Sequence, residues 1–470
     1  MAHIFRRSSV CTWFNSLLLV CSVLSGCVFT PAEFETEEHK LEIAGRIYQL
    51  PLEQRRLPAL SQPTSWSEVL HLALLANGEL EAAYRQWEGA LQRVTQAGGF
   101  PNSNLAPSFS YLVSPAGMKS WDRTTISVGF DPMLNLSFPT KIIKAARLAL
   151  KEAQTAGEAF RLAKFGLQAK VLDQYLDLAL LDERIRNAGE EVFALQLLAE
   201  LSSQRVGLGT PERELLRATI ESEFSKNDLA ILLEERASAQ AGLNAILGRN
   251  PHEALLLPPE LPNPRQASLD AVLALGLESN PELVALFHQH GAREEALDLA
   301  LLQFIPDINP GFALSGSVSR SLAAMLILPT TVPQIRAAAN QAKAELQQVR
   351  ALSRQAALDK RADFAQELIA FRGSQRQLEL FQEKILPAAK QSLELARSAY
   401  TVGQVTLSEL LESQRTLLEV KNSLAEARIE REKRLIALET LAAVDIEAQS
   451  LHPDVSAIDH KSNLAGGNHE

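Results

Sequence analysis

The sequence predicts a mainly α-helical protein with a small β part, built as a duplicated unit of two β-strands plus long antiparallel helices. An internal repeat is the first observation: residues 66–80 (WSEVLHLALLANGEL) are similar to residues 269–283 (LDAVLALGLESNPEL), so that Asn77 aligns with Asn280. The second is that each copy leads through a Pro-containing, strand-like stretch into a long tract rich in Ala, Leu, Glu, Gln and Arg. Repetition of one supersecondary unit predicts a duplicated architecture.

The N-terminus has the order of an export signal. Arg6 and Arg7 are followed by a short apolar run and by Leu-Ser-Gly-Cys at residues 24–27, which is the order of a charged region, an apolar core and a cleavage site. The apolar run is shorter than the roughly 20 residues that span a bilayer. Leu-Ser-Gly-Cys resembles the lipobox of bacterial lipoproteins, in which cleavage precedes a lipidated cysteine. We therefore expect a lipoprotein signal peptide at residues 1–26 and lipidation of Cys27, with an ordinary cleaved signal as the alternative.

Composition narrows the class of protein. The formal net charge is −10, and removal of Arg6 and Arg7 with the signal makes it −12. This acidic balance argues against nucleic acid as a partner, since phosphate binding depends on Lys and Arg. The mature chain has one cysteine, so no disulfide framework is expected. It also has no stretch apolar enough for a transmembrane helix, so a membrane span would be a β-barrel or a lipid anchor. Val28 follows Cys27, and by resemblance to lipoproteins this favours sorting to the outer membrane.

The first half of the mature chain alternates between helical and strand periods. Residues 27–65 are acidic and contain several prolines, which predicts an extended N-terminal arm. In the first structural repeat, residues 66–250, apolar residues recur at helical spacing and then at alternate positions. The expected elements are a helix at 67–97, a hairpin with strands around 109–113 and 126–130, and helices at 140–205 and 212–247. At about 1.5 Å per residue the first long helix would be on the order of 100 Å long, which no compact globule can hold.

The second half repeats this plan after a Pro-rich linker at residues 251–268. The second structural repeat, residues 269–445, is followed by a polar C-terminal tail at residues 446–470. Its expected elements are a helix at 269–302, strands around 312–318 and 323–328, a helix at 334–399 and a helix at 407–443. Pro387 should kink the longer helix. The second pair of strands is short against the about 9–11 residues of a transmembrane strand, which makes this hairpin marginal as a membrane span.

The last expected helix has a coiled-coil pattern. Leu410, Leu417, Leu424 and Leu438 lie at spacings of seven or fourteen, with Arg431 interrupting the series. A spacing of seven residues between leucines predicts that this helix packs side by side with another, as in a coiled coil. The polar residues on the flank indicate that one side of this helix faces water; they are Gln414, Lys421 and Arg428.

These features together resemble a TolC-like outer membrane efflux protein of the lipid-anchored subgroup. The most specific part is Tyr400-Thr-Val-Gly403, followed by a Leu-rich turn with acidic residues three apart and a long helix; residues 205–216 are its counterpart in the first half. The resemblance implies a homotrimer that forms an α-helical tunnel with a shared 12-stranded β-barrel. It also implies a lipid-anchored location in the cell outer membrane with a periplasmic tunnel. The implied function is the outer membrane channel of a tripartite efflux or secretion system, with a periplasmic adaptor and an inner membrane pump as partners.

The resemblance also implies which residues carry the function. Aligned on Tyr400 and Gly403, Glu409 and Glu412 fall on the positions that form acidic rings at the periplasmic aperture. Residues three apart share one face of a helix, and a ring of carboxylates favours cations. The alternative is that both are solvated surface charges. The expected helix-tip turns, which the family uses to meet the adaptor, contain Gly207, Gly209, Tyr400 and Gly403.

The residues do not indicate an enzyme. His288 and His290 are two apart, on different faces of a helix, and are more typical of surface residues than of metal ligands. No nucleophile elbow, phosphate loop or Cys/His metal spacing is present, so no cofactor and no metal site are expected. A lipid-anchored periplasmic coiled-coil adaptor or scaffold without a channel is the alternative function. Adaptors have one helical hairpin, whereas this chain predicts two. Nothing in the residues selects a drug, metal, lipid or protein as cargo.

Overall fold

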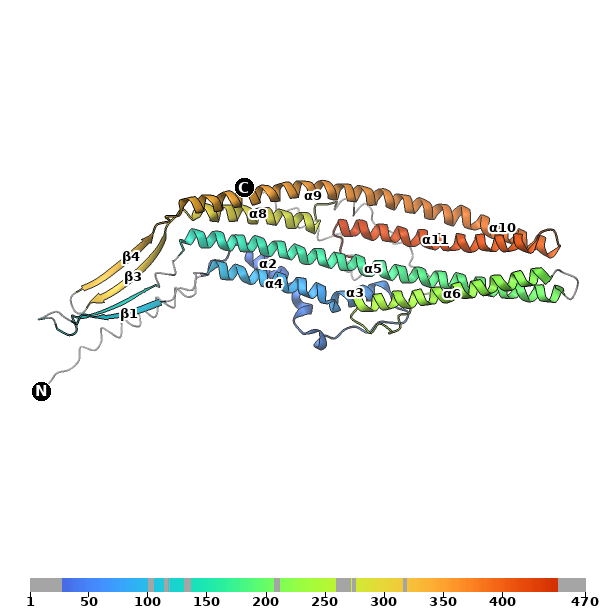
Figure 1. Cartoon of the computed structure of the whole chain (residues 1–470), viewed down its shortest axis with the longest axis horizontal. Coiled ribbons are helices and arrows are strands. Elements are labelled where there is room, and N and C mark those ends of the chain that lie inside the picture. Colours follow the sequence, from blue (N-terminus) through green and yellow to red (C-terminus); the bar gives the residue numbers. More distant parts are fainter. Residues whose placement is uncertain are drawn as a thin grey trace. The chain divides into compact units, whose positions relative to one another are not determined.

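The computed structural model describes residues 28–99, 105–113, 117, 119–130, 137–206, 212–258, 272, 276–315 and 319–446. The chain divides into two compact units, each made of three segments. Unit 1 comprises Met1–Arg46, Ala83–Phe160 and Val284–Gln355, and unit 2 comprises Ile47–Ala82, Arg161–Leu283 and Ala356–Glu470. Because both halves of the sequence contribute to each unit, the two repeats are interleaved (Figure 1).

Unit 1 contains one antiparallel sheet with the strand order β1-β2-β3-β4. Its strands are β1 (Leu105–Tyr111), β2 (Thr124–Phe130), β3 (Asp307–Ser315) and β4 (Ser319–Ile327). The ladder between β2 and β3 joins the two repeats and runs from Thr125 opposite Ser315 to Gly129 opposite Gly311. It stops beside Pro310, whose ring nitrogen carries no hydrogen to donate. Pro107 lies in β1, an edge strand, where proline is tolerated.

The prediction that the second hairpin has short strands is wrong. β3 and β4 have nine residues each, whereas β1 and β2 have seven. The sequence analysis placed the third strand around 312–318 and the fourth around 323–328, which left Asp307–Gly311 and Ser319–Leu322 outside them. Main-chain pairing carries these residues into the sheet: Asp307 lies opposite Ile327, and Ser319 lies opposite Ser315.

The two faces of the sheet differ in polarity. Register places Phe109, Ile126 and Leu314 in one row across three strands, and all three are exposed. The next positions point to the other face, because side chains alternate along a strand. There the side chains are small and polar, with Ser108 bonded to Ser127 across 2.6 Å and Thr125 to Ser315 across 2.8 Å.

Helices make up most of the rest of the described chain. Their bounds are α2 (Phe34–Gly45), α3 (Trp66–Ala76), α4 (Gly78–Gly98), α5 (Pro139–Val206), α6 (Glu212–Ile246), α8 (Pro281–Leu302), α9 (Val332–Leu380), α10 (Leu386–Thr401) and α11 (Leu407–Leu441). The expected long helices agree with α5, α6 and α11. No described helix combines the length and apolarity that crossing a bilayer requires.

Three expected segments differ from the structure. The arm at 27–65 is not extended throughout, because it contains α2 and two short 3-10 helices, Arg46–Tyr48 and Leu52–Gln54. The expected helix at 67–97 is divided into α3 and α4 at Asn77. The expected helix at 269–302 is described as a helix from Pro281 onward, with turns at residues 276–279.

The repeated asparagines explain both of these helix starts. The Oδ1 atom of Asn77 accepts a hydrogen bond from the N–H of Leu80 at 3.0 Å, at the first turn of α4. In the second repeat, the Oδ1 atom of Asn280 accepts from the N–H groups of Glu282 at 3.1 Å and Leu283 at 3.3 Å. A side-chain oxygen at this position satisfies amides that have no partner inside the helix. The repeat motif therefore marks a helix start.

The break at Pro387 is confirmed, and its form is specific. A π-helix at Phe381–Ile385 separates α9 from α10, and the N–H of Leu386 donates to the carbonyl of Phe381. Pro387 is one of the first residues of α10. A proline in a helix removes one hydrogen bond and crowds the preceding turn, and a wider turn relieves both.

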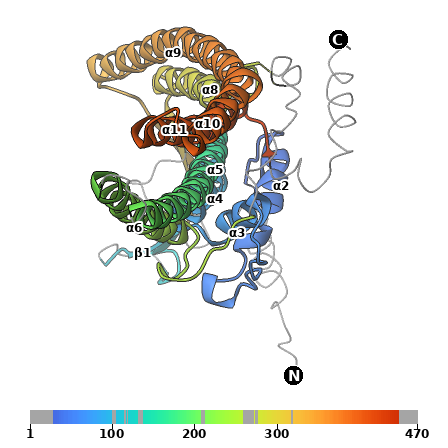
Figure 2. The same ribbon diagram turned by 90° about the vertical axis from the view of Figure 1, so that its right-hand side faces the viewer.

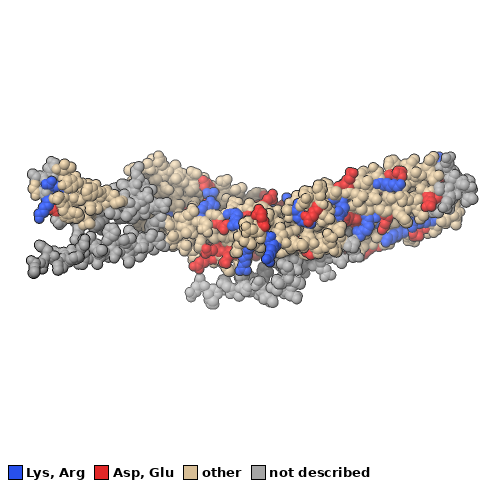
Figure 3. Space-filling view, turned by 90° about the horizontal axis from the view of Figure 1, so that it is seen from below, with Lys and Arg blue, Asp and Glu red and all other residues tan. Residues whose placement is uncertain are grey.

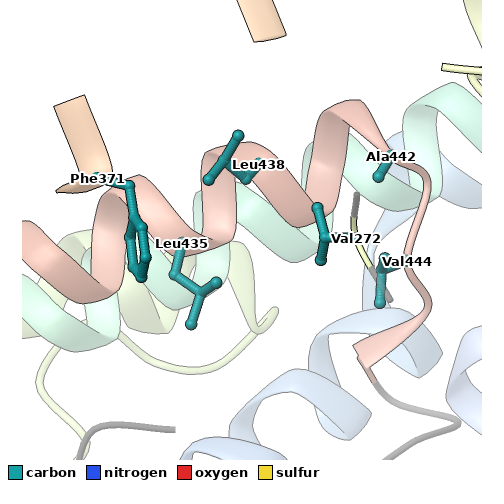
Figure 4. Packing of buried hydrophobic residues seen from close by; sticks show 6 residues of the cluster. All are labelled: Val272, Phe371, Leu435, Leu438, Ala442 and Val444. Atoms are coloured by element: carbon teal, nitrogen blue, oxygen red, sulfur yellow. The ribbon is translucent and has the colours of Figure 1, made fainter. Parts of the chain in front are cut away.

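Unit 2 contains two helical hairpins. α5 runs beside α6, and α10 beside α11, in both Figure 1 and Figure 2. One apolar cluster lies where α11 ends and α9 passes (Figure 4); it consists of Val272, Phe371, Leu435, Leu438, Ala442 and Val444. The guanidinium of Arg431 lies 5.4 Å from the centroid of the Phe371 ring, so the residue that interrupts the leucine series covers an aromatic face.

Substitution of the two asparagines should separate capping from burial. Asn280 is 4% exposed and its Nδ2 also donates to the carbonyl of Leu441 at 2.9 Å. We expect Asn280→Ala to lower the free energy of unfolding by about 2–4 kcal/mol, since a cap and a buried hydrogen bond are both lost. Asn77→Ala, which loses the cap, should cost about 1 kcal/mol. Urea denaturation in detergent, followed by helical circular dichroism, measures both; equal losses would contradict the assignment.

Candidate functional site at the tip of the second helical hairpin

The tip of the second hairpin begins where α10 ends. Gly403 has a φ of 76°, in the left-handed region that favours glycine. Its N–H donates to the carbonyl of Tyr400 at 3.1 Å, and the N–H of Gln404 donates to the carbonyl of Ala399 at 2.9 Å. These two bonds form a Schellman motif, which satisfies the last carbonyls of a helix. Gly403 thus sits where a helix-tip turn was expected.

The N-cap of α11 is Thr406, three residues after Gly403, and it forms a capping box. The N–H of Glu409 donates to Thr406 Oγ1 at 3.4 Å, and Glu409 Oε2 accepts from the N–H of Thr406 at 3.4 Å. This reciprocal pair satisfies two amides at the helix start and also places a negative charge at the positive end of the helix dipole.

The two expected aperture residues are both exposed at this tip. Glu412 lies one turn after Glu409 on α11. Glu409 has a structural task in the capping box, which the sequence pattern Thr-x-x-Glu at residues 406–409 could have indicated. Their role at an aperture stays a prediction.

Tyr400 packs at the base of the tip. It contacts two apolar clusters, one between α10 and α11 that includes Leu393 and Leu410, and one that includes Leu407 and Leu411 of α11. The second cluster also contains Leu195 of α5 and Ala218 of α6, so both hairpins meet there. A groove of about 440 Å³ lies beside Tyr400, lined by Phe193, Leu197, Leu198, Arg397 and Gln414 among others.

Polar contacts join the two hairpins above this cluster, and sequence reasoning missed them. From the tip upward, the pairs between α11 and the first hairpin are Ser408 with Arg217, Arg415 with Glu221, Gln414 with Glu191, Lys421 with Glu190, Asn422 with Asn187, and Glu426 with Arg184. We call these pairs the polar seam. Gln414 and Lys421, which were expected to face water, are partly exposed and each also bonds to α5. The sequence separation of about 200 residues hid these partners.

Glu191 is the most buried carboxylate of the polar seam. It is 5% exposed and accepts a hydrogen bond from Gln414 Nε2 at 2.8 Å. Burial raises the pKa of Glu191 above its usual value of 4.5. The hydrogen bond from Gln414 opposes that rise, and so do the positive charges of Arg415 and Lys421. Burial therefore outweighs the attraction of the nearby positive charges.

The remaining expected site residues lie elsewhere. Gly207, Gly209 and Cys27 lie outside the described residues. In the part of the chain that the structure describes, no group of three His, Cys, Asp or Glu side chains could hold a metal ion. His288 is half-buried, with its Nδ1 atom out of contact with solvent, and so is less superficial than expected. His290 Nε2 lies 2.9 Å from Arg350 Nε.

Acidic and basic side chains are interspersed along the helices on the face drawn in Figure 3. The described helices contain many i,i+3 and i,i+4 ion pairs, such as Arg434 with Glu430 at 2.7 Å. Exposed pairs of this kind stabilise a helix by only a few tenths of a kcal/mol. The charge pattern of this face is consistent with a solvated helical surface.

The geometry defines a class of protein. A sheet assembled from two duplicated strand pairs, with two long helical hairpins, is the architecture of the TolC-like channel proteins. Residues 272–444 match the family model described as outer membrane efflux protein. This match agrees with the expected resemblance to TolC-like outer membrane efflux proteins.

Known relatives extend over nearly the whole chain. It is 23% identical over 457 residues to the pyoverdine export outer membrane protein OpmQ of Pseudomonas aeruginosa, covering 90% of this chain and 95% of that protein. It is 24% identical over 452 residues to the probable outer membrane lipoprotein SilC of Salmonella typhimurium, covering 89% and 95%. The crystal structure of the outer membrane protein VceC from Vibrio cholerae has a TM-score of 0.68 at 18% identity, covering 80% of this chain and 96% of that chain. This last likeness concerns the fold.

Replacing Gly403 tests the tip conformation. Gly403→Ala should lower the free energy of unfolding by about 1–2 kcal/mol, because an alanine resists the left-handed conformation. Gly373→Ala in α9 is the matched control: no atom lies within 4 Å of its added Cβ. The control should stabilise by up to about 1 kcal/mol, since alanine favours the helix. Thermal denaturation of both variants measures these changes. An unchanged stability of Gly403→Ala would contradict the assignment.

Glu191 makes stability depend on pH in a defined direction. A carboxyl with a raised folded-state pKa binds its proton more tightly when folded, so the free energy of unfolding rises as pH falls through that raised pKa and levels off below 4.5. Glu191→Gln should remove this contribution and be at least as stable as the wild type at pH 7. Denaturation of both proteins between pH 4 and pH 8, about the range over which carboxyls of this kind titrate, gives the difference. A constant difference across that range would contradict the assignment.

Proposed function

We propose that this protein is the outer membrane channel of a tripartite efflux or secretion system, which passively conducts cargo from a periplasmic adaptor and an inner membrane pump to the exterior. The observation that carries the proposal is the sheet of unit 1. Its exposed apolar row of Phe109, Ile126 and Leu314 suits contact with lipid, while the Ser and Thr side chains of the other face suit water. Alternation of this kind is typical of a strand that separates the two.

The edges of the sheet support a homotrimer. β1 and β4 each pair on one side only within the described chain. Unpaired main-chain groups are not tolerated in the apolar part of a bilayer, and four strands cannot close a barrel alone. Three copies, each adding four strands edge to edge, would close a shared barrel of 12 strands.

Exposed apolar side chains on the first hairpin of unit 2 also favour neighbouring copies. Phe193 of α5 is 70% exposed, and Ile220 and Phe224 of α6 are 54% and 63% exposed. Clusters of large exposed apolar residues mark protein contacts more often than free surface. Packing of these faces in a trimer would form the walls of a periplasmic tunnel.

The polar seam suits a tip that opens. In this proposal, α10 and α11 separate from α5 and α6 at the tip, so that carboxylates of Glu409 and Glu412 from three copies move apart. Ion pairs near the surface, such as Lys421 with Glu190 at 2.6 Å, contribute little to stability and exchange readily with water. The helix-tip turns at Gly207, Gly209, Tyr400 and Gly403 would meet the adaptor.

The proposal places the protein in the outer membrane, anchored by lipid at Cys27. The lipobox-like residues 24–27 and Val28 support this, and SilC, a relative over most of the chain, is named as a lipoprotein. No catalytic role is proposed, which fits a family of channels.

Single-channel conductance tests the proposal. Purified protein in planar bilayers should give discrete conductance steps that prefer cations, and Glu409→Gln with Glu412→Gln should weaken this preference several-fold because the carboxylate rings are neutralised. Glutamine keeps the capping box at residues 406–409, so the charge changes without loss of the helix start. Glu223→Gln, an exposed acidic residue on α6, is the control and should leave selectivity unchanged.

Two results would contradict separate parts of the proposal, the role of the two glutamates and the channel itself. If the double variant conducts with unaltered ion selectivity, Glu409 and Glu412 do not line the aperture and are solvated surface charges. A folded protein that stays monomeric in detergent and forms no channels would favour a lipid-anchored periplasmic coiled-coil adaptor or scaffold.

A further inference from the structure

The first described segment of the chain lies along helices of unit 1. The N–H of Phe29 donates to the carbonyl of Gly98, the last residue of α4, at 2.9 Å. The carboxylate of Glu33 accepts from Lys151 Nζ at 2.9 Å and from Gln154 Nε2 at 3.1 Å, both on α5. α2, which follows, lies beside α4 in Figures 1 and 2. We call residues 28–45 the strap.

A buried carboxylate holds the middle of the strap. Glu37 is 4% exposed, and its Oε1 accepts a hydrogen bond from Trp87 Nε1 on α4 at 3.2 Å. Its other oxygen lies 3.2 Å from Lys40 Nζ. Because a buried charge is costly unless it is paired and hydrogen-bonded, this arrangement favours one position of the strap over others.

Three glycines allow the close approach of the strap. An added Cβ would lie within 3 Å of another residue at Gly45, Gly98 and Gly157. At Gly98 the obstacle is the main-chain oxygen of Phe29, at 2.1 Å. At Gly157, on α5, the obstacles are Glu37 Oε1 and the Trp87 ring, both at 2.9 Å.

The third glycine belongs to the strap itself. A Cβ on Gly45 would lie 2.0 Å from the hydroxyl oxygen of Tyr84, whose side chain is buried on α4. None of the three glycines has a positive φ. They are therefore needed for space and not for backbone conformation, and all three lie where the strap meets α4 and α5.

We propose that residues 28–45 are an intramolecular docking element, and that Gly98 and Gly157 form its seat on α4 and α5 while Gly45 closes it. The seat holds Phe29 at the end of α4. Cys27 is two residues earlier, a reach of about 7 Å at most. If Cys27 is lipidated, as the proposed function states, the seat fixes the anchored end beside the point where the chain leaves α4 toward β1. The position of the anchor then depends on the strap as well as on the lipid.

Hydrogen–deuterium exchange of the full-length protein in detergent tests the seat. In Gly98→Ala and Gly157→Ala, we expect peptides from residues 28–45 to exchange at least tenfold faster than in the wild type. Gly89→Ala on α4 and Gly166→Ala on α5 are the matched controls, since an added Cβ meets no atom within 4 Å at either position. The controls should leave exchange of the strap unchanged. Equal exchange in the test variants and the controls would overturn the proposal.

A second pair of variants covers the case in which an alanine disrupts unit 1, recognised by faster exchange of α8. Glu33→Ala removes the contacts to Lys151 and Gln154 from an exposed residue, whereas Glu35→Ala changes an exposed neighbour. Faster strap exchange in the first variant alone supports the seat, and no difference contradicts it. The same measurements in Cys27→Ser, which cannot be lipidated, should give the same pattern. Strap docking is thereby tested separately from lipidation and from channel activity.

Discussion

The main-chain ladder between β2 and β3 is the contact on which the duplicated architecture depends. It pairs residues of the two repeats that are about 190 positions apart, such as Thr125 opposite Ser315, whose side-chain hydroxyls also form a hydrogen bond. Without it each repeat would hold an isolated two-stranded hairpin, which is marginally stable in water. With it, one sheet receives both repeats, and each hairpin of strands leads into its own pair of long helices.

The contact between the helical hairpins in unit 2 combines two kinds of interaction. At the tip, Leu195, Leu407 and Leu411 form an apolar cluster that excludes water. Above it the polar seam joins the same helices through ion pairs and amides, most of them partly exposed. Apolar contact favours association without direction, whereas polar pairs specify which residues lie opposite each other. The small apolar cluster thus holds the two hairpins together at the tip, and the polar seam fixes their alignment along the helix axes.

Local sequence patterns predicted the long helices, the first hairpin and the break at Pro387, because these depend on periodicity, proline and glycine. They failed where long-range pairing overrides local preference. Ser319 and Ser321 lay outside the expected fourth strand yet belong to β4, opposite Ser315 and Ala313. At the candidate site, Gly403 was predictable from its place after a helical pattern. The partners of Gln414 and Lys421 were not, because they come from α5, more than 200 residues earlier.

The glycines of this chain also differ in what they supply. Gly403 provides a backbone conformation, whereas Gly98 and Gly157 provide space for another segment. A sequence pattern distinguishes the first kind by its place at a helix end, but it gives no sign of the second.

The π-helix before Pro387 has a consequence for how the chain tolerates insertion and deletion. A π-turn holds one residue more than an α-turn. In a regular α-helix, by contrast, each added or removed residue rotates everything after it by about 100° around the helix axis. Phe381 and Ile385, within this turn, pack with Leu410 and Leu417 of α11 as part of one cluster. Deleting a single residue between 381 and 385 would therefore let this turn close to an ordinary α-helical turn and leave the phase of α10 against α11 unchanged. The same deletion in the middle of α9, a regular α-helix, would rotate the residues after it by about 100°, so this short turn is the place where the hairpin that carries the tip tolerates a change of length.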